Sequence, residues 1–368
     1  MKVIIKKASY DYETLRPLVF DMMNSLGGDL IENHSRVIIK PNLLVQAKPE
    51  QAVLTHPSIV RAVAEYVLER GAHPHICDSP GMGSFDRLIR ESGFRDALKG
   101  LDVTCRPFKN STHMDIGEPF GRIEMAEEAV NADFIINLPK FKTHSQMLLT
   151  LGVKNLFGCV VGFRKAEWHL RTGVNRDLFA CLLVQIHQAL KPFMTIMDGI
   201  LAMEGDGPGK GGTPKKLGLL LASNNALALD VTACRLLGLR PDQLPTNQAA
   251  REMGLLDLHF KVQGNVERIV DFKLPESASL ISGPRPLHGF VRRQLLQRPV
   301  PDDSLCTLCG ECWKFCPAGA IQETSGNLKF DYDKCIRCYC CIEVCPQGAL
   351  RARETLPGRL VQKLIRRF

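Results

Sequence analysis

Eight cysteines near the end of the chain constrain its structure more than any other feature. They form two copies of one spacing, C-x2-C-x2-C-x3-C-P, in which a proline follows each fourth cysteine. The first copy contains Cys306, Cys309, Cys312 and Cys316, and the second contains Cys335, Cys338, Cys341 and Cys345. Thiolates that converge from a tight loop are the ligands that iron-sulfur clusters need. The spacing therefore predicts a small cluster-binding domain over residues 305–354.

The spacing resembles that of bacterial ferredoxins, in which three thiolates of one motif and the fourth of the other hold each [4Fe-4S] cluster. The resemblance implies two clusters, one on Cys306, Cys309, Cys312 and Cys345, the other on Cys335, Cys338, Cys341 and Cys316. Zinc sites usually show separated C-x2-C pairs, and a disulfide scaffold is typical of short secreted chains, whereas MKVIIKKASY lacks the apolar segment of a signal peptide. Cys340 fits neither copy of the spacing and is interpreted as a spare thiol.

Upstream of the cysteines, short apolar segments alternate with helical patterns. The segments are bounded by polar, Gly or Pro residues, as buried parallel strands often are. They are Val3 to Lys6, Val37 to Lys40, Pro74 to Cys77, Phe134 to Asn137, Met194 to Met197 and Leu217 to Leu221. The clearest helices are expected at 56–70, with Thr55 as N-cap, and at 226–237, with Asn225 as N-cap.

This alternation predicts an α/β fold for residues 1–282, with a mostly parallel sheet covered by helices and with one or two subdomains. A linker rich in Pro and Arg is expected at 283–304, and the small α+β ferredoxin-like domain follows it.

Polar residues follow the predicted strands where ligands of such sheets bind, beyond the carboxyl ends. Lys40 and Asn42 follow one strand, Asp78 follows the next, and Asp198 follows a later one. A further strand leads into Lys140, Lys142 and His144. Because a buried lysine is costly without a partner, these residues predict a pocket for a small anionic molecule. The alternative, in which each lysine reaches solvent or pairs with a nearby aspartate, stays open.

Several motifs in this region resemble a known family. They are Lys40-Pro41-Asn42, Asn137-Leu138-Pro139-Lys140, Gly152-Val153-Lys154-Asn155-Leu156-Phe157-Gly158, and Asp198-Gly199 with Met203-Glu204-Gly205-Asp206-Gly207-Pro208. In this order they are similar to the family called domain of unknown function 362. The resemblance implies an iron-sulfur protein of anaerobic or redox metabolism. It also implies that one site gathers Lys40, Asn42, Asp78, Lys140, Lys154, Asn155, Asp198 and Asp230.

On this basis the predicted catalytic residues are Lys140, His144, Lys154 and Asp198, and the predicted substrate-binding residues are Lys40, Asn42, Asp78, Asn155 and Asp230. His56 and His169 are interpreted as structural, since a lone histidine is more often hydrogen-bonded within the fold than catalytic. The glycine-rich segment 205–213 does not match a Walker A motif. It is expected to be either a mobile loop or lid near a ligand, or an ordinary connector.

The formal net charge of +8 is concentrated in part at residues 351–368. Residues 355–368 are expected to form a basic amphipathic helix that packs on this protein, lies on a membrane surface or docks on a partner. The basic residues are not interleaved with aromatics, so no nucleic-acid partner is expected. No run approaches the roughly 18 apolar residues of a membrane span, and a cytoplasmic location is expected.

Together these features predict an iron-sulfur redox protein. It would move single electrons through two [4Fe-4S] clusters to or from an anionic substrate or cofactor in the α/β region, with a redox partner protein. The alternative is a non-catalytic electron carrier or docking subunit of a larger oxidoreductase.

Overall fold

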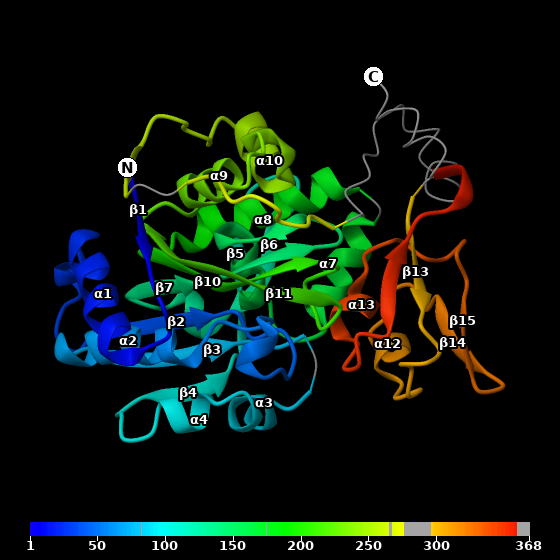
Figure 1. Ribbon diagram of the computed structural model, residues 1–368, viewed down its shortest axis with the longest axis horizontal. Helices are drawn as coiled ribbons and strands as arrows, with labels where there is room; N and C mark the ends of the chain where they lie inside the picture. Colours follow the sequence, from blue (N-terminus) through cyan, green and yellow to red (C-terminus); the bar gives the residue numbers. More distant parts are fainter. Residues whose placement is uncertain (82, 174, 265–266, 276–295, 359–368) are drawn as a thin grey trace.

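The computed structural model describes residues 1–81, 83–173, 175–264, 267–275 and 296–358, and consists of an α/β region and a smaller C-terminal module (Figure 1). A ten-stranded sheet forms the centre of the α/β region, with the main order β12-β1-β11-β10-β7-β2-β3-β4, and β8 and β9 branch from β10. Six of its nine strand pairings are parallel. The predicted mostly parallel sheet is therefore confirmed.

All six apolar segments predicted as strands lie within strands of this sheet. The strands are β1 (Lys2–Lys7), β2 (Arg36–Pro41), β3 (His73–Asp78), β4 (Thr104–Pro107), β7 (Phe134–Leu138), β8 (Lys140–His144), β9 (Leu148–Thr150), β10 (Met194–Gly205), β11 (Gly212–Ser223) and β12 (Lys261–Gln263). A separate hairpin pairs β5 (Ser111–Asp115) with β6 (Arg122–Ala126).

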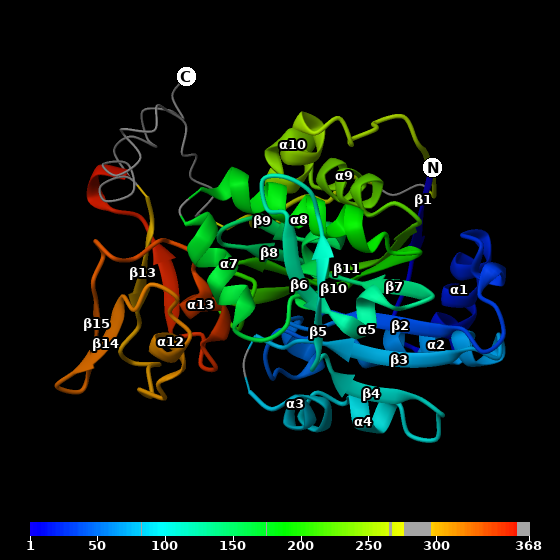
Figure 2. The ribbon, with the colours of Figure 1, turned by 180° about the vertical axis from the view of Figure 1, so that it is seen from behind.

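Helices cover both faces of the sheet, as Figures 1 and 2 show from opposite sides. Alternate residues of β2 explain the two layers, because successive side chains of a strand point to opposite faces. Val37 and Ile39 belong to the hydrophobic cluster under α1 (Tyr12–Ser25) and α2 (Pro57–Glu69). Ile38, between them, belongs to the cluster under α8 (Arg176–Leu190).

The remaining helices of this region are short or peripheral. They are α3 (Phe85–Glu91), α4 (Phe94–Ala97), α5 (Glu127–Val130), α6 (Gly152–Asn155), α7 (Arg164–Thr172), α9 (Ala226–Leu236) and α10 (Pro245–Glu252). Asn225 caps α9 as expected, since its side chain accepts a hydrogen bond from the Ala228 N–H at 2.9 Å. The N-cap of α2 is His56 and not Thr55, because Nδ1 of His56 accepts from the Ser58 N–H at 3.2 Å.

The C-terminal module is built from two small two-stranded antiparallel sheets and two short helices. Strand β13 (Arg298–Pro301) pairs with β16 (Leu350–Arg353), and β14 (Ile321–Thr324) pairs with β15 (Asn327–Phe330). Helix α12 (Glu311–Lys314) lies within the first cysteine motif, and α13 (Cys340–Val344) lies within the second. Because β13 is part of the module, the predicted linker extends too far, and residues 298–301 belong to the folded domain instead. Residues 359–368 of the predicted terminal helix lie outside the described residues.

The glycine-rich segment 205–213 packs between the α/β region and the module. The Gly207 carbonyl accepts hydrogen bonds from the Ser145 N–H and hydroxyl, at 3.1 and 2.8 Å. A methyl group at Gly209 would lie 3.0 Å from the Glu343 carbonyl oxygen of α13. The segment therefore connects β10 and β11, and its backbone packs closely on α13 of the module.

Candidate functional site

Polar side chains beyond the carboxyl ends of β2 and β3 help to line a cavity of about 110 Å³. Helices α6 and α7 form other parts of its wall, and α13 of the C-terminal module closes one side. Six of the nine predicted catalytic and substrate-binding residues line it: Lys40, Asn42, Asp78, His144, Lys154 and Asn155. Seven further polar residues that were not in that set also line it: Ser79, Lys142, Thr150, Lys165, His169, Cys340 and Glu343.

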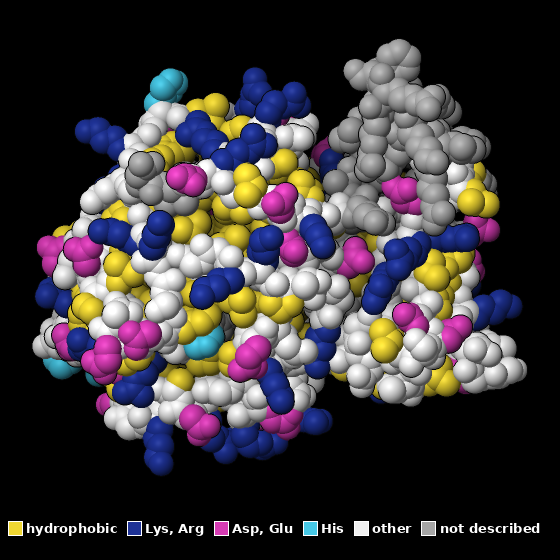
Figure 3. Space-filling view, viewed as in Figure 1, with side chains coloured by type: hydrophobic (Ala, Val, Ile, Leu, Met, Phe, Trp, Pro, Cys, Tyr) yellow, Lys and Arg dark blue, Asp and Glu magenta, His cyan; other side chains and the backbone are white. Residues whose placement is uncertain are grey.

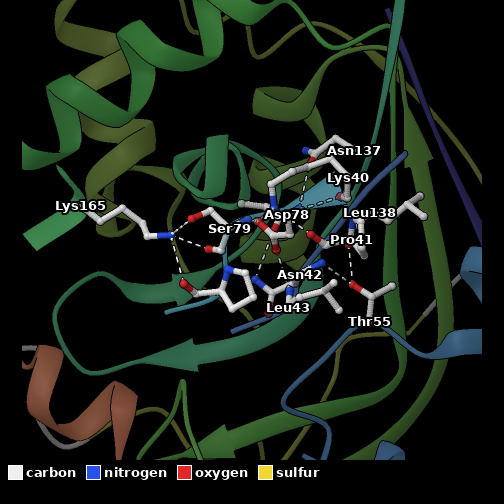
Figure 4. Close-up of polar contacts among 12 residues, drawn as sticks. Lys40, Pro41, Asn42, Leu43, Thr55, Asp78, Ser79, Asn137, Leu138 and Lys165 are labelled. Atoms are coloured by element: carbon white, nitrogen blue, oxygen red, sulfur yellow. Dashed lines mark hydrogen bonds and ion pairs between the residues drawn. The ribbon is translucent and has the colours of Figure 1, made fainter. Parts of the chain in front are cut away.

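Lys40 and Asp78 form a buried ion pair on this wall (Figure 4). Lys40 Nζ lies 2.8 Å from Asp78 Oδ1 and donates to the Pro41 carbonyl at 2.7 Å. Asp78 also accepts from the N–H groups of Leu43 and Ser79, both at 2.8 Å. Gly158 packs directly on the pair, since a Cβ there would lie 2.3 Å from Asp78 Oδ1. The pair shapes the wall and adds no net charge to it.

Three other lysines bring positive charge to the cavity, and none forms an ion pair with a carboxylate among the described residues. Lys142 Nζ donates to the carbonyls of Val53 and Pro208, at 2.8 and 3.2 Å. Lys165 Nζ donates to the carbonyl and hydroxyl oxygens of Ser79 (Figure 4). Lys154 Nζ lies 5.9 Å from the ring centroid of Phe157.

Burial in this wall makes the charged form of each of these lysines less favourable. It lowers the pKa of Lys142 to about 7 and the pKa of Lys165 to about 8. The pKa of Lys154 is also lowered by burial, although Glu343 partly opposes the shift. A bound anion would offset this penalty for all three.

Glu343 reaches the cavity from the module and faces His144. Nε2 of His144 lies 2.8 Å from Glu343 Oε1. Nδ1 of His144 accepts from the N–H groups of Gln146 and Met147, so the proton of the neutral ring is on Nε2 and faces the carboxylate. Burial lowers the pKa of His144 to about 4. Burial would raise the pKa of Glu343, but His144 and Lys154 outweigh it and lower that pKa below its usual range.

Asn155 and Asp230 mainly hold α6 in position. Asn155 Nδ2 donates to Asn137 Oδ1 at 2.8 Å, and Asn155 Oδ1 accepts from Asn42 Nδ2 at 2.9 Å. Asp230 accepts from the N–H groups of Gly152 and Val153, at 2.7 and 3.1 Å. Burial raises the pKa of Asp230 to about 7. Asp230 does not line the cavity, and it holds the start of the helix that carries Lys154.

Lys140 and Asp198 lie in a different cluster, away from the cavity lining. Lys140 Nζ is 2.7 Å from Asp198 Oδ2, and both side chains are fully buried. The Tyr10 hydroxyl donates to Asp198 Oδ1 at 2.8 Å, and the His56 ring stacks on Tyr10 at 3.6 Å. The predicted grouping of Lys140 and Asp198 with Lys40 and Lys154 is therefore not what the fold produces.

The cysteines of the two motifs fall into two sets of four. The Cys312 thiol lies near those of Cys306, Cys309 and Cys345, and these four line one small cavity. The Cys341 thiol lies near those of Cys316, Cys335 and Cys338, and also near the Cys312 thiol of the first set. No group of three or more Cys, His, Asp or Glu side chains in the described part of the chain converges tightly enough to hold a single metal ion.

Backbone donors are present at one sulfur of each set. The Ala320 N–H donates to Cys316 Sγ at 3.3 Å, and the Ala349 N–H donates to Cys345 Sγ at 3.2 Å. Such hydrogen bonds favour thiolate over thiol, as cluster ligation requires. The donor atoms and their arrangement thus fit iron-sulfur clusters.

Comparison with known proteins identifies the α/β region. Residues 37–235 match the domain of unknown function DUF362. The chain belongs to the DUF362 family. Residues 298–346 match a 4Fe-4S dicluster domain, so the C-terminal module of this DUF362 protein is ferredoxin-like and its predicted iron-sulfur character is confirmed.

Two curated relatives cover different parts of the DUF362 protein. A thylakoid-associated protein of Synechocystis is 37% identical over 280 residues, which are 74% of this chain and 87% of the relative. Pyruvate synthase subunit PorD of Methanocaldococcus jannaschii is 48% identical over 59 residues, which are 16% of this chain and 69% of PorD. The PorD match supports an electron-transfer role for the module.

Among solved structures, the lactate racemase apoprotein of Thermoanaerobacterium thermosaccharolyticum matches with a TM-score of 0.43 and 13% identity. The match covers 64% of this chain and 56% of that one.

Among the described residues, none of the helices has the length and apolar composition needed to cross a membrane.

The different surroundings of Lys140 and Lys154 lead to a stability prediction. Lys140→Met should lower the free energy of unfolding by about 3–5 kcal/mol, because it leaves the buried Asp198 carboxylate without its ion partner. Lys154→Met is the matched control. It should change the free energy of unfolding by about 1 kcal/mol or less, since no carboxylate is ion-paired with Lys154 in the described chain. Anaerobic urea unfolding followed by circular dichroism measures both, and equal losses would contradict the assignment of Lys140 to a structural pair.

Proposed function

We propose that this DUF362 protein is a redox protein that moves single electrons between two [4Fe-4S] clusters and a small anion bound in the cavity. The observation that carries the proposal is the position of α13. Cys341 of this helix is a predicted cluster ligand, while Cys340 and Glu343 of the same helix line the cavity. One short helix thus belongs to both the proposed electron carrier and the proposed binding site.

The two sets of thiols differ in their relation to the cavity. We call the predicted cluster on Cys316, Cys335, Cys338 and Cys341 proximal, because two residues next to its ligands, Phe315 and Cys340, line the cavity, whereas one such residue, Val344, adjoins a ligand of the other set. We call the predicted cluster on Cys306, Cys309, Cys312 and Cys345 distal. Cys309 is exposed, which supports electron exchange with a partner at the distal side. Clusters of this type supply one-electron transfer.

The charge of the cavity wall supports an anion as the ligand. Lys142, Lys154 and Lys165 face one carboxylate, Glu343, while Lys40 and Asp78 neutralise each other. In the proposed site the three lysines bind the anion, and His144 orients Glu343 on the side of the proximal cluster. Lys140 and Asp198, predicted as catalytic, are proposed to stabilise the fold instead.

A second candidate function is a non-catalytic carrier or docking subunit, and the similarity of the module to PorD, named as a subunit of pyruvate synthase, favours it. In both cases a redox partner protein is proposed. The proposed setting is cytoplasmic and anaerobic. Contact of residues 355–368 with a membrane surface stays a prediction.

Analysis of the bound small molecule tests the proposed function directly. Anaerobically purified protein should release an anion on denaturation, detected by mass spectrometry. Lys154→Met and Lys165→Met should each lower its amount at least about tenfold, because each removes a cation that it contacts. Lys99→Met, at an exposed site, is the control. Visible absorption of the clusters should be unchanged in all three variants, and undiminished anion in the first two would refute the site.

The lowered lysine pKa values predict how anion binding depends on pH. Lys142 and Lys165 lose their protons as the pH rises through about 7 and about 8, and an anion prefers the protonated forms. The dissociation constant of sulfate, which does not titrate in this range, should therefore rise between pH 6 and pH 9. For each proton that the protein takes up when sulfate binds, the dissociation constant should rise by about tenfold per pH unit. Isothermal titration calorimetry checks this, and a flat profile in the wild type would be inconsistent with anion contact by these lysines.

A further inference from the structure

Apart from His144 and Glu343, which face each other, three side chains of the cavity wall have a buried polar atom without a hydrogen-bond partner in the described chain: Asn42, Thr150 and His169. Of these three residues, Thr150 and His169 are almost fully buried. Thr150, at the end of β9, is 3% exposed, and His169, on α7, is 4% exposed. Neither Thr150 Oγ1 nor His169 Nδ1 has a partner among the described residues. Both residues line the cavity. A buried polar group without a partner destabilises a fold by about 1–3 kcal/mol, so the position of these atoms requires an explanation.

The surroundings of His169 would suit an apolar ring equally well. Its ring meets Phe157 edge-on at 5.5 Å and Phe179 at 4.4 Å. Packing therefore accounts for an aromatic side chain at this position but not for its nitrogen atoms. Likewise, valine has the shape of threonine without the hydroxyl group. Both residues line the cavity, so their polar atoms can serve to bind a molecule there.

The size of the cavity limits what can occupy it. At roughly 10–15 Å³ for each water-sized group, its 110 Å³ holds about 7 to 11 non-hydrogen atoms. A nucleotide or a flavin is larger than this. The molecule or group that the cavity encloses is therefore small.

We infer that the ligand is a small organic acid with a second oxygen function, a hydroxyl or a carbonyl group, whose oxygen binds Thr150 and His169. This inference rests on the anion site of the proposed function, in which Lys142, Lys154 and Lys165 bind the acidic group. A threonine hydroxyl donates or accepts a hydrogen bond, and so does a neutral imidazole, depending on its tautomer. Both oxygen functions therefore suit these partners. Thr150 was not singled out by the sequence, and His169 was interpreted from it as structural.

Three acids with the same four-carbon skeleton test the inference. Malate carries a hydroxyl group, oxaloacetate carries a carbonyl group, and succinate carries neither. We expect malate or oxaloacetate to bind the anaerobic holoprotein at least about tenfold more tightly than succinate, because succinate leaves the polar atoms of Thr150 and His169 unpaired. Calorimetric titrations with sulfate as a reference anion measure this.

Thr150→Val and His169→Phe separate ligand binding from folding. Each variant should lose the preference over succinate and keep its affinity for succinate within about threefold. Each should also unfold at the same or a higher temperature than the wild type, since it removes an unpaired polar atom. A merely structural role would instead lower the unfolding temperature and leave the preference intact, which would overturn the inference.

The possible failures are distinct. If succinate binds as tightly as malate and oxaloacetate, or if sulfate binds and none of the acids does, the inference is wrong while the anion site stands. If neither sulfate nor any acid binds, the anion site of the proposed function fails as well.

Discussion

The burial of lysine side chains at the carboxyl end of the sheet is the constraint on which the rest of this structure depends. An ammonium group taken out of water needs an opposite charge or several acceptors. Lys40 and Lys140 receive carboxylates, Asp78 and Asp198, each within 3 Å. Lys142 and Lys165 receive only uncharged oxygens. The fold thus gives two lysines a carboxylate partner, and it leaves the others beside a cavity with lowered pKa values and without an ion pair among the described residues.

Two features of the chain keep this arrangement in place. Gly158 allows the 3₁₀ turn after α6 to pass over the Lys40–Asp78 pair, where any side chain would collide with both groups. Asp230 fixes the other end of the same segment by accepting from the first N–H groups of α6. The Gly152–Gly158 motif therefore forms part of the cavity wall. Its glycines, the amide of Asn155 and the carboxylate of Asp230 hold Lys154 in position. This explains why a motif that contains two glycines can form part of a precise site.

Local patterns predicted the strands, the main helices and the two cysteine motifs, because these depend on neighbours within a few residues. They could not separate Lys140 from Lys142, which lie two residues apart in β8. The register of β8 against β10 shifts between Asp198 and Met203, so the two lysines do not meet the same surroundings. The partner of the Asp198 cluster, Tyr10, is 188 residues away in sequence. Likewise, Cys340 and Glu343 belong to the cavity only because the module docks on the α/β region, and His169 shows its unpaired nitrogen only in three dimensions.

The docking of α13 also links charge in the cavity to charge on the proximal cluster of the proposed function. An added electron and a bound anion are both negative, and the same three lysines are available to both. They therefore compete for one set of positive charges, so an anion should bind the oxidised protein more tightly than the reduced one. By linkage, the bound anion lowers the potential of the adjacent cluster to the same extent. A site formed jointly by a cluster helix and unpaired lysines is thus suited to passing an electron onward once its ligand is in place, because the bound anion makes the neighbouring cluster a stronger reductant.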